Sequence, residues 1–406
     1  MATIRPFHAV RPTPALAARV ASVPYDVVDT AEARQLAEGN PWSFLHVIRP
    51  EIDLPEGTDP HADTVYAQSA AAYGRLLAEG TLVRDATPAL FAYRQVMGDH
   101  AQTGIMGCCS VDEYDADVIK KHEKTRPDKE DDRVAHLLAV SAHSEPVFLA
   151  HHDDPAIAAL TAAATTGTPL YNFVAADGVR HTVWSIEGAA ARQLSAAFAP
   201  VPALYVADGH HRSAAASRAR AAVRQRGEAR PEADHFLAVV FPAGALQILP
   251  YHRIAHDLGG RSVEDFLRAL RAVATVRPGG PVPSGRGRFS MYLEGTWHEV
   301  EAPAERLADP DPVASLDAAI LQSLVLAPLL GIDDPRTSHR IEFVGGIRGP
   351  EELVRRVDRR GGSVAFALHP VSMDQLMVVS DAGLVLPPKS TWFEPKLRSG
   401  LAVHEF

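Results

Sequence analysis

Residues 203–227, ALYVADGHHRSAAASRARAAVRQRG, join a short apolar segment to an Ala- and Arg-rich segment through a glycine. The first part, residues 203–206, favours a strand, and residues 213–225 favour a helix that ends at Gly227. The first turn of a helix has unpaired backbone N–H groups and partial positive charge. Because Gly209 lacks a Cβ, an anion can approach the backbone closely there. With His210, His211 and Arg212 as side-chain donors, the junction predicts a phosphate-binding cradle.

A plainer interpretation of the same residues is an ordinary helix start. Asp208 would then be the N-cap, and the two histidines would lie on the surface. A His-His-Arg run directly after a strand-to-helix turn is also typical of a phosphate-binding site. The residues alone leave both interpretations open.

The most charged part of the chain is residues 120–133, KKHEKTRPDKEDDR. A run of charges is usually a solvated loop. The functional interpretation takes Glu123 as the one carboxylate of the KKHEK segment, kept ionised by neighbouring lysines such as Lys124. Composition alone favours the loop.

A third polar segment lies near the C-terminus, where Lys389-Ser390-Thr391 follows two prolines and Lys396 follows Pro395. Prolines stiffen such a loop, so that its ammonium and hydroxyl groups can grip a carboxylate or phosphate. Taken alone, residues 386–406 are better explained as a structured tail, too rich in proline and polar groups for a core element.

The composition is that of a globular chain. It has 406 residues, of which 46% are hydrophobic and 22% charged, and the length predicts two or three domains. The net charge of -10 argues against nucleic acid or an anionic membrane as partner. Cys108 and Cys109 are adjacent, which predicts reduced thiols.

The chain is expected to be soluble and cytoplasmic. Proline and arginine interrupt the N-terminal segment, so no signal peptide is predicted, and the most apolar stretch, residues 321–332, is too short to cross a bilayer.

Strands and helices alternate along the chain, which predicts an α+β (mixed α/β) protein. Residues 43–48 are expected to form a strand, residues 90–96 and 103–111 a hairpin, and residues 313–330 a helix. We predict an N-terminal α/β extension over residues 1–100, a core over 101–255 with an insertion at about 126–202, and a C-terminal α/β domain over 256–406.

Several fingerprints of known sites are missing from the sequence. It contains no C-x-x-C or H-E-x-x-H spacing, no Walker A motif and no G-x-G-x-x-G. A structural zinc site is therefore not expected, and metal ligands are left unknown.

The three polar segments, in this order, resemble the free L-serine kinase-like family of the ParB/sulfiredoxin-like superfamily, including longer bacterial relatives with KHEKT and DGHHR motifs. The likeness consists of His122-Glu123 after a strand, DGHHR at residues 208–212, and a C-terminal strand and helix followed by PKST at residues 388–391 and Pro395-Lys396. It covers about residues 105–125 and 203–406, and the first hundred residues have no counterpart in the compact kinase.

The resemblance implies a nucleotide-binding core, a tail that returns to the site, and phosphorylation of a small amino acid, free L-serine above all. It makes Glu123 the general base, with His122 and Asp208 as further catalytic residues. Nucleotide phosphates, from ATP or ADP with Mg²⁺, would bind Gly209, His210, His211, Arg212 and Lys124. The amino acid would bind Lys389, Ser390, Thr391 and Lys396.

The same superfamily supplies alternatives. Sulfiredoxins have a reactive cysteine where this chain has His210, so repair of sulfinic acid is not expected. A non-catalytic nucleotide-binding regulatory module of the ParB-like type stays open, as does another phosphotransferase or hydrolase on the same cradle. Oligomeric state is left open, as is whether Tyr25-Asp26 lines the pocket or forms a turn.

Overall fold

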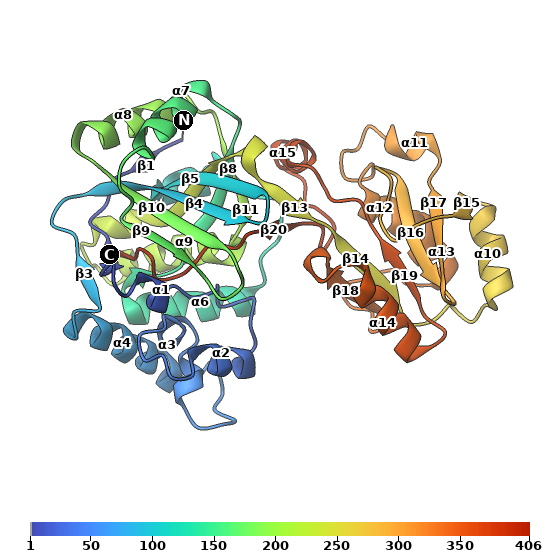
Figure 1. Ribbon diagram of the computed structural model, residues 1–406, viewed down its shortest axis with the longest axis horizontal. Helices are drawn as coiled ribbons and strands as arrows, with labels where there is room; N and C mark the ends of the chain where they lie inside the picture. The colour runs from blue at the N-terminus through green and yellow to red at the C-terminus, as the bar shows by residue number, and fades with distance from the viewer. Residues whose placement is uncertain (1) are drawn as a thin grey trace. The chain divides into compact units, whose positions relative to one another are not determined.

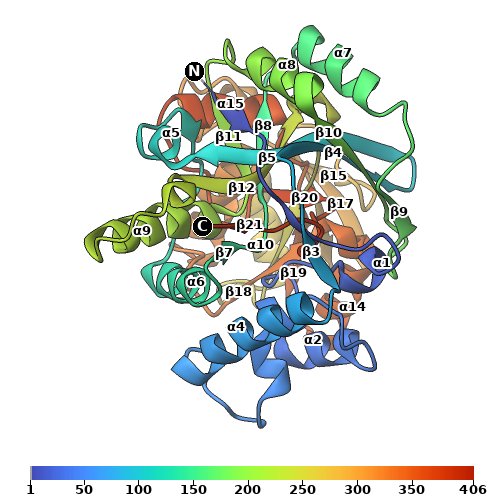
Figure 2. The same ribbon diagram turned by 90° about the vertical axis from the view of Figure 1, so that its left-hand side faces the viewer.

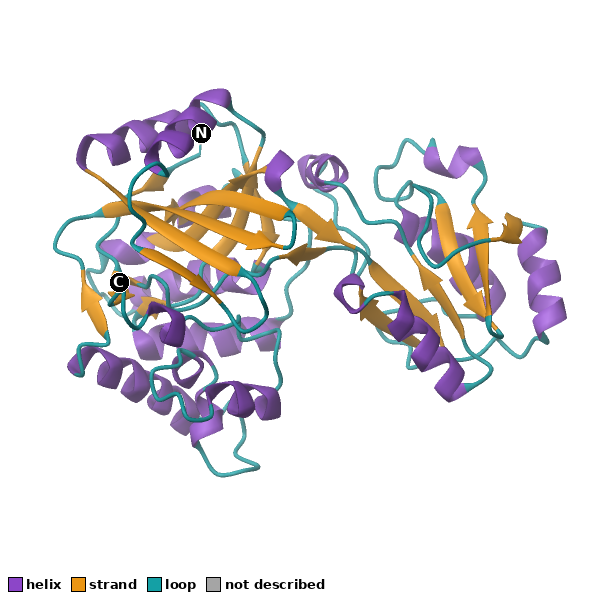
Figure 3. Ribbon diagram, viewed as in Figure 1, coloured by secondary structure: helices purple, strands orange, loops and turns teal. Residues whose placement is uncertain are grey.

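The computed structural model describes residues 2–406. The chain divides into two compact units: residues up to Leu246 together with Pro395–Phe406, and Gln247–Glu394. Each unit combines helices and sheet (Figure 3), which confirms the predicted α+β class. In this division the first hundred residues and most of the following core belong to one unit. The boundaries predicted at 100/101 and 255/256 remain a prediction.

A nine-stranded mixed sheet forms the centre of the first unit. Its strands, in spatial order, are β6 (Ile119–Lys120), β11 (Leu204–Asp208), β8 (Val147–His151), β12 (His235–Pro242), β5 (His100–Ser110), β4 (Ala89–Met97), β10 (Arg180–Glu187) and β9 (Tyr171–Val174), and β1 (Ile4–Arg5) pairs with β5. The predicted hairpin is β4 with β5. Two small sheets pair β2 (Val10–Pro12) with β3 (Leu82–Arg84) and β7 (Ala142–His143) with β21 (His404–Glu405).

Several helices belong to the first unit. They are α1 (Ala17–Val20), α2 (Thr30–Ala37), α3 (Leu45–Ile48), α4 (Asp63–Ala78), α5 (Val111–Asp115), α6 (Pro127–Val140), α7 (Pro155–Ala164), α8 (Gly188–Phe198) and α9 (His210–Gln225), with short 3-10 turns η1 (Pro50–Asp53), η2 (Pro231–Asp234) and η3 (Ala243–Ala245). Helices α7 and α8 lie on one side of the sheet, and α6 and α4 on the other (Figures 1 and 2). Helix α9 packs on α6 through Leu137, Ala215 and Ala219.

The central strands β8 and β12 are apolar along nearly their whole length because both of their faces are covered. Cys108 and Cys109 of β5 are buried free thiols, as predicted, and burial raises their pKa values.

The prediction of a strand over residues 43–48 is wrong, because residues 45–48 form α3. Phe44, Leu45, Val47 and Ile48 all pack into one apolar cluster. Positions with this spacing share one face of a helix, whereas neighbouring side chains of a strand point to opposite faces.

The C-terminal tail is also more deeply integrated than its composition predicts. Leu397, Leu401 and Val403 are buried, and the backbones of Val10 and Val403 bond to each other. The polar groups of this tail are satisfied by its neighbours, so a segment rich in proline still contributes to the core.

The second unit is built on a six-stranded sheet. Its strands are β15 (Thr275–Pro278), β17 (Thr296–Glu301), β16 (Arg288–Leu293), β19 (Val364–Ala367), β14 (Tyr251–Ala255) and β18 (Ile341–Gly345), and β13 (Gln247–Leu249) pairs separately with β20 (Trp392–Glu394). Its helices are α10 (Val263–Arg271), α11 (Ala304–Leu307), α12 (Asp317–Leu321), α13 (Ala327–Leu330), α14 (Pro350–Arg360) and α15 (Met373–Asp381), with the 3-10 turn η5 (Gly346–Arg348). The helix predicted over residues 313–330 is therefore shorter than expected, and a π-helical turn, η4 (Gln322–Leu326), separates α12 from α13.

Candidate functional site

The topology of the first unit brings two of the predicted motifs together. Strands β6 and β11 are adjacent and parallel, with Leu204 opposite Ile119. Parallel neighbours end at the same edge of a sheet, which is where open α/β sheets place their ligands. The segment with His122-Glu123 leaves β6 at this edge, and the segment with Gly209-His210 leaves β11 beside it.

His210 connects the two motifs. The backbone N–H of His122 donates to Nε2 of His210 over 3.4 Å, and the two rings meet edge to face with centroids 4.4 Å apart. The other ring nitrogen, Nδ1, lies 3.9 Å from Oε2 of Glu123. Glu123 itself is 59% exposed, so its carboxylate can meet a small molecule from solvent.

Both of these histidines are neutral near pH 7. Burial lowers the pKa of His122 to about 4, against the opposing effects of Asp208 and a hydrogen bond with the backbone of Val206. Burial, together with His122, also holds the pKa of His210 well below its usual value. Because the Nε2 lone pair of His210 already accepts the His122 N–H, this ring can offer a ligand the N–H at Nδ1 but no positive charge.

Asp208 lies at the end of β11 between two cations. Its Oδ2 accepts a hydrogen bond from Nη2 of Arg212 over 3.1 Å and lies 3.5 Å from Nζ of Lys396. Desolvation alone would raise its pKa, but Lys396 and Arg212 outweigh this and hold the pKa of Asp208 well below its usual range. Lys396 belongs to the tail segment of the first unit, so this tail reaches the DGHHR motif.

Arg212 is buried, with 7% of its surface exposed. Its guanidinium donates to the carbonyl of Pro146 and to Asp208, while its buried Nε has no hydrogen-bond partner among residues 2–406. Burial disfavours its charge, but Asp208, Asp26 and Glu145 raise its pKa above the usual value. In this geometry Arg212 holds Asp208 in place, and phosphate contact by its fork remains a prediction.

Gly209 has a role that the sequence did not reveal. It is the N-cap of α9, with φ of 95°, and no side chain caps the helix there. A Cβ at this position would lie 3.0 Å from Nε and 3.1 Å from Cζ of Arg212. The missing Cβ thus makes room for the Arg212 guanidinium, and the positive φ favours glycine independently.

The other residues predicted for the nucleotide lie around this edge. Nε2 of His211 accepts the backbone N–H of Arg126 over 3.2 Å, and Lys124 is exposed. The ammonium of Lys121 is held elsewhere, by the carbonyl of Tyr114 at 2.8 Å and by Asp117 at 3.1 Å.

Lys389, Ser390 and Thr391 belong to the second unit. There Oγ of Ser390 donates to the carbonyl of Pro387 over 2.6 Å, and Nζ of Lys389 lies 5.5 Å from the ring centre of Tyr251. Lys389 has a left-handed backbone, with φ of 53°, which is strained for a residue with a side chain. The hydrogen bond of Ser390 and the left-handed backbone of Lys389 define the conformation of this loop. Its contact with a substrate remains a prediction.

A buried ionic group behind Arg212 was not predicted. Nη1 of Arg133 lies 3.5 Å from Glu145, and its guanidinium stacks 3.9 Å from the ring centre of Tyr25. The backbone N–H of Tyr25 donates to Glu145 over 3.0 Å. Of these residues, only Tyr25 stands out in the sequence, where Tyr25-Asp26 after Val23-Pro24 is a candidate for lining the pocket. Ser144-Glu145-Pro146 and Arg133 have the pattern of ordinary loop and helix residues.

Magnesium does not fit this donor set directly. Asp208 is already paired with two cations, and among residues 2–406 no group of three or more His, Cys, Asp or Glu side chains could hold a metal ion. Within the same residues, no helix is both long and apolar enough to cross a bilayer.

Comparison with known proteins places these observations in a family. A family model described as "Protein of unknown function (DUF1015)" matches residues 4–319 of the chain. No curated protein matches it.

Several solved structures are distantly similar. A conserved hypothetical protein from Pyrococcus furiosus is 13% identical, with 74% of this chain and 94% of that chain covered and a TM-score of 0.35. Free serine kinase in complex with AMP is 12% identical, with 73% and 91% covered and a TM-score of 0.34. SbnI with C-terminal truncation, from Staphylococcus aureus, is 13% identical, with 71% and 82% covered and a TM-score of 0.37. Likenesses this distant do not assign the site, whose interpretation therefore depends on its own geometry and motifs.

Proposed function

The chain belongs to the DUF1015 family, and we propose that it is a nucleotide-dependent kinase that converts free L-serine to O-phospho-L-serine. The observation that carries the proposal is the meeting of three chain segments at one edge of the sheet. Glu123 follows β6, the start of α9 follows β11, and Lys396 comes from the tail. These supply a carboxylate, an anion-binding helix end and an ammonium group.

This combination suits phosphoryl transfer, in which positioning and electrostatic stabilisation matter more than a strong base. The nucleotide phosphates would bind the start of α9 at Gly209, His210 and His211, with Lys124 at the exposed side. The N-terminal end of this 16-residue helix has no side-chain cap and favours a negatively charged group.

Glu123 would act as the general base. The seryl oxygen attacks the terminal phosphorus of ATP or ADP, the bond from that phosphorus to the bridging oxygen breaks, and the hydroxyl proton passes to the Glu123 carboxylate. His210 supports this step, because the hydrogen bond from His122 to Nε2 leaves the proton of the neutral ring on Nδ1, which faces Glu123. A carboxylate in this role contributes about 10²–10⁴-fold.

Lys396 would bind the amino acid, and the motif resemblance implies the same role for Lys389, Ser390 and Thr391. For Lys396 the support is its position 3.5 Å from Asp208. Mg²⁺ would come bound to the nucleotide and neutralise its phosphates.

Isothermal titration of the full chain with ATP and with ADP, each with and without L-serine, tests the proposal. We expect one of the nucleotides to bind and to be consumed in the presence of L-serine. Nucleotide binding without turnover of any hydroxy amino acid would favour the regulatory module instead. If neither nucleotide binds, the prediction of a phosphate-binding cradle is wrong.

A further inference from the structure

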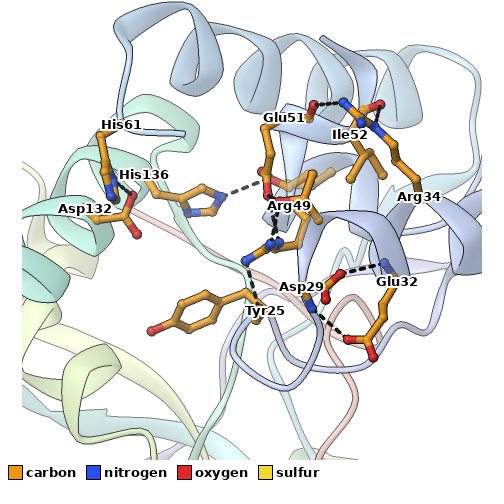
Figure 4. Close-up of polar contacts among 12 residues, drawn as sticks. Tyr25, Asp29, Glu32, Arg34, Arg49, Glu51, Ile52, His61, Asp132 and His136 are labelled. Atoms are coloured by element: carbon orange, nitrogen blue, oxygen red, sulfur yellow. Dashed lines mark hydrogen bonds and ion pairs between the residues drawn. The ribbon is translucent and has the colours of Figure 1, made fainter. Parts of the chain in front are cut away.

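A second cavity lies in the first unit, apart from the cradle. Its volume is about 150 Å³, and it lies among the loop before α2, the segment from α3 to η1, the start of α4, and α6 (Figure 4). No residue of 122–124 or 208–212 lines it. It is therefore a separate site, and its interpretation does not depend on phosphoryl transfer.

The carboxylates in its wall already have partners. Oδ1 of Asp132 accepts from the Tyr66 hydroxyl over 3.0 Å and lies 3.1 Å from Nδ1 of His61, and its Oδ2 pairs with Arg133. Oε1 of Glu51 lies 2.9 Å from Nε of Arg49. Figure 4 shows His61 and Asp132 close together, apart from Arg49 and Glu51.

The cations outnumber them. Arg49, Arg133 and Lys129 line the cavity against Glu51 and Asp132. Arg133 also lies 3.5 Å from Glu145, so among the described residues Lys129 is the cation of the lining without a carboxylate partner. Nε of Arg49 is buried and, although close to Glu51, is at an angle that makes no hydrogen bond. The Lys129 ammonium, which is exposed, makes no hydrogen bond or ion pair within residues 2–406.

Part of the wall is apolar, and the space is small. Ile48, Pro50, Pro60 and Val65 form this apolar part, which suits a short carbon skeleton better than a bare inorganic anion; Tyr25, Thr30 and His136 complete the lining. A cavity of this size can hold a molecule as large as benzene, whereas a nucleotide is far too large.

We propose that this cavity binds a small monocarboxylic acid of about six to eight non-hydrogen atoms, with its carboxylate toward Arg49 and Lys129 and its carbon chain against the apolar wall. The Lys129 ammonium and the Arg49 guanidinium select the anion, and hydroxyl substituents of the acid meet the polar groups around Asp132.

Calorimetric titration of the full chain without nucleotide tests this, using L-lactate and D-glycerate as acids and glycerol as a neutral molecule of similar size. We expect at least one acid to bind with a Kd of about 1 mM or tighter, and glycerol not to bind. Arg49→Gln should raise the Kd for that acid about tenfold, and Lys129→Gln should also raise it.

Arg224→Gln is the matched control, because Arg224 pairs with Asp234 at the surface of α9 and does not line the cavity; it should bind the acid as wild type does. If Arg49→Gln does not melt cooperatively, it is not folded, and the binding measured with the surface variant Lys129→Gln then tests the proposal.

The proposal is overturned if no acid binds at about 10 mM, if glycerol or inorganic phosphate binds as tightly as the acids, or if both cavity variants bind like wild type. Nucleotide titrations on the same samples report on the cradle alone, so failure of either site is seen separately.

Discussion

At the scale of single residues, the site depends on what surrounds Asp208. Its carboxylate is shared by Arg212, which is buried and fixed, and by Lys396, whose side chain comes from the tail. The pair with Lys396 is thus the link between the cradle and the last segment of the chain.

Lys396→Gln is expected to raise KM for L-serine about tenfold, with a smaller change in kcat, because it removes an ammonium that would bind the amino acid. Lys121→Gln is the matched control, since that ammonium is held by Tyr114 and Asp117. Steady-state kinetics measure both variants. An unchanged KM in the Lys396 variant would place the substrate elsewhere.

The residue types of the site could be chosen from the sequence, but their contacts could not. Glu123, His210 and Asp208 stand out because of their motifs. The burial of Arg212, and its return over Gly209, depend on Pro146 and Glu145, which lie more than sixty positions away and carry no motif.

At the scale of elements, the start of α9 is the most constrained part of the site. The strand-to-helix turn after β11 was predicted from its apolar run and glycine, and the structure agrees. The short segment SFLHVI at residues 43–48, bounded by Pro41 and Pro50, predicts a strand, but its apolar positions 44, 45, 47 and 48 have the spacing of a helical face, and the structure follows that spacing.

Gly209→Ala is expected to destabilise the protein by about 1–2 kcal/mol, because alanine is strained at φ of 95° and its Cβ would crowd Arg212. Gly74→Ala is the control: Gly74 is inside α4 with ordinary φ and nothing within 4 Å of a Cβ, so alanine should stabilise the helix slightly. Urea denaturation measures both. Equal stabilities of the two variants would contradict the geometry of the turn.

At the scale of the whole molecule, the meeting of the motifs follows from topology. Nothing in the sequence states that β6 and β11 are parallel neighbours, because each is short and eighty or more residues separate them. The resemblance in motif order supplied that expectation. The depth at which the tail is buried could not be predicted, because it depends on partners such as Val10.

The buried histidines make stability depend on pH. His122, His136 and His404 each have a pKa lowered to about 4 by burial, against about 6.5 when unfolded. Their stabilising effect is complete above about pH 6.5 and is lost as the pH falls toward 4, because only the unfolded chain takes up protons in that range.

Between pH 7 and pH 5, each of these histidines should cost about 2 kcal/mol of unfolding free energy. Scanning calorimetry should therefore show a melting transition of the first unit that falls steeply over this range. His122→Gln removes one of these buried titrating groups, so its melting temperature should fall less steeply with pH. A transition temperature that stays constant from pH 7 to pH 5 would show that these rings are accessible to protons in the folded state.

The most direct test of the central claim is phosphorus NMR of the full chain with nucleotide, Mg²⁺ and L-serine, in wild type, Glu123→Gln and the surface control Glu228→Gln. We predict that wild type and Glu228→Gln form O-phospho-L-serine, while Glu123→Gln binds nucleotide normally but turns over about a hundredfold more slowly. Formation of phosphoserine at the wild-type rate by Glu123→Gln, or its absence with wild type, would contradict the account.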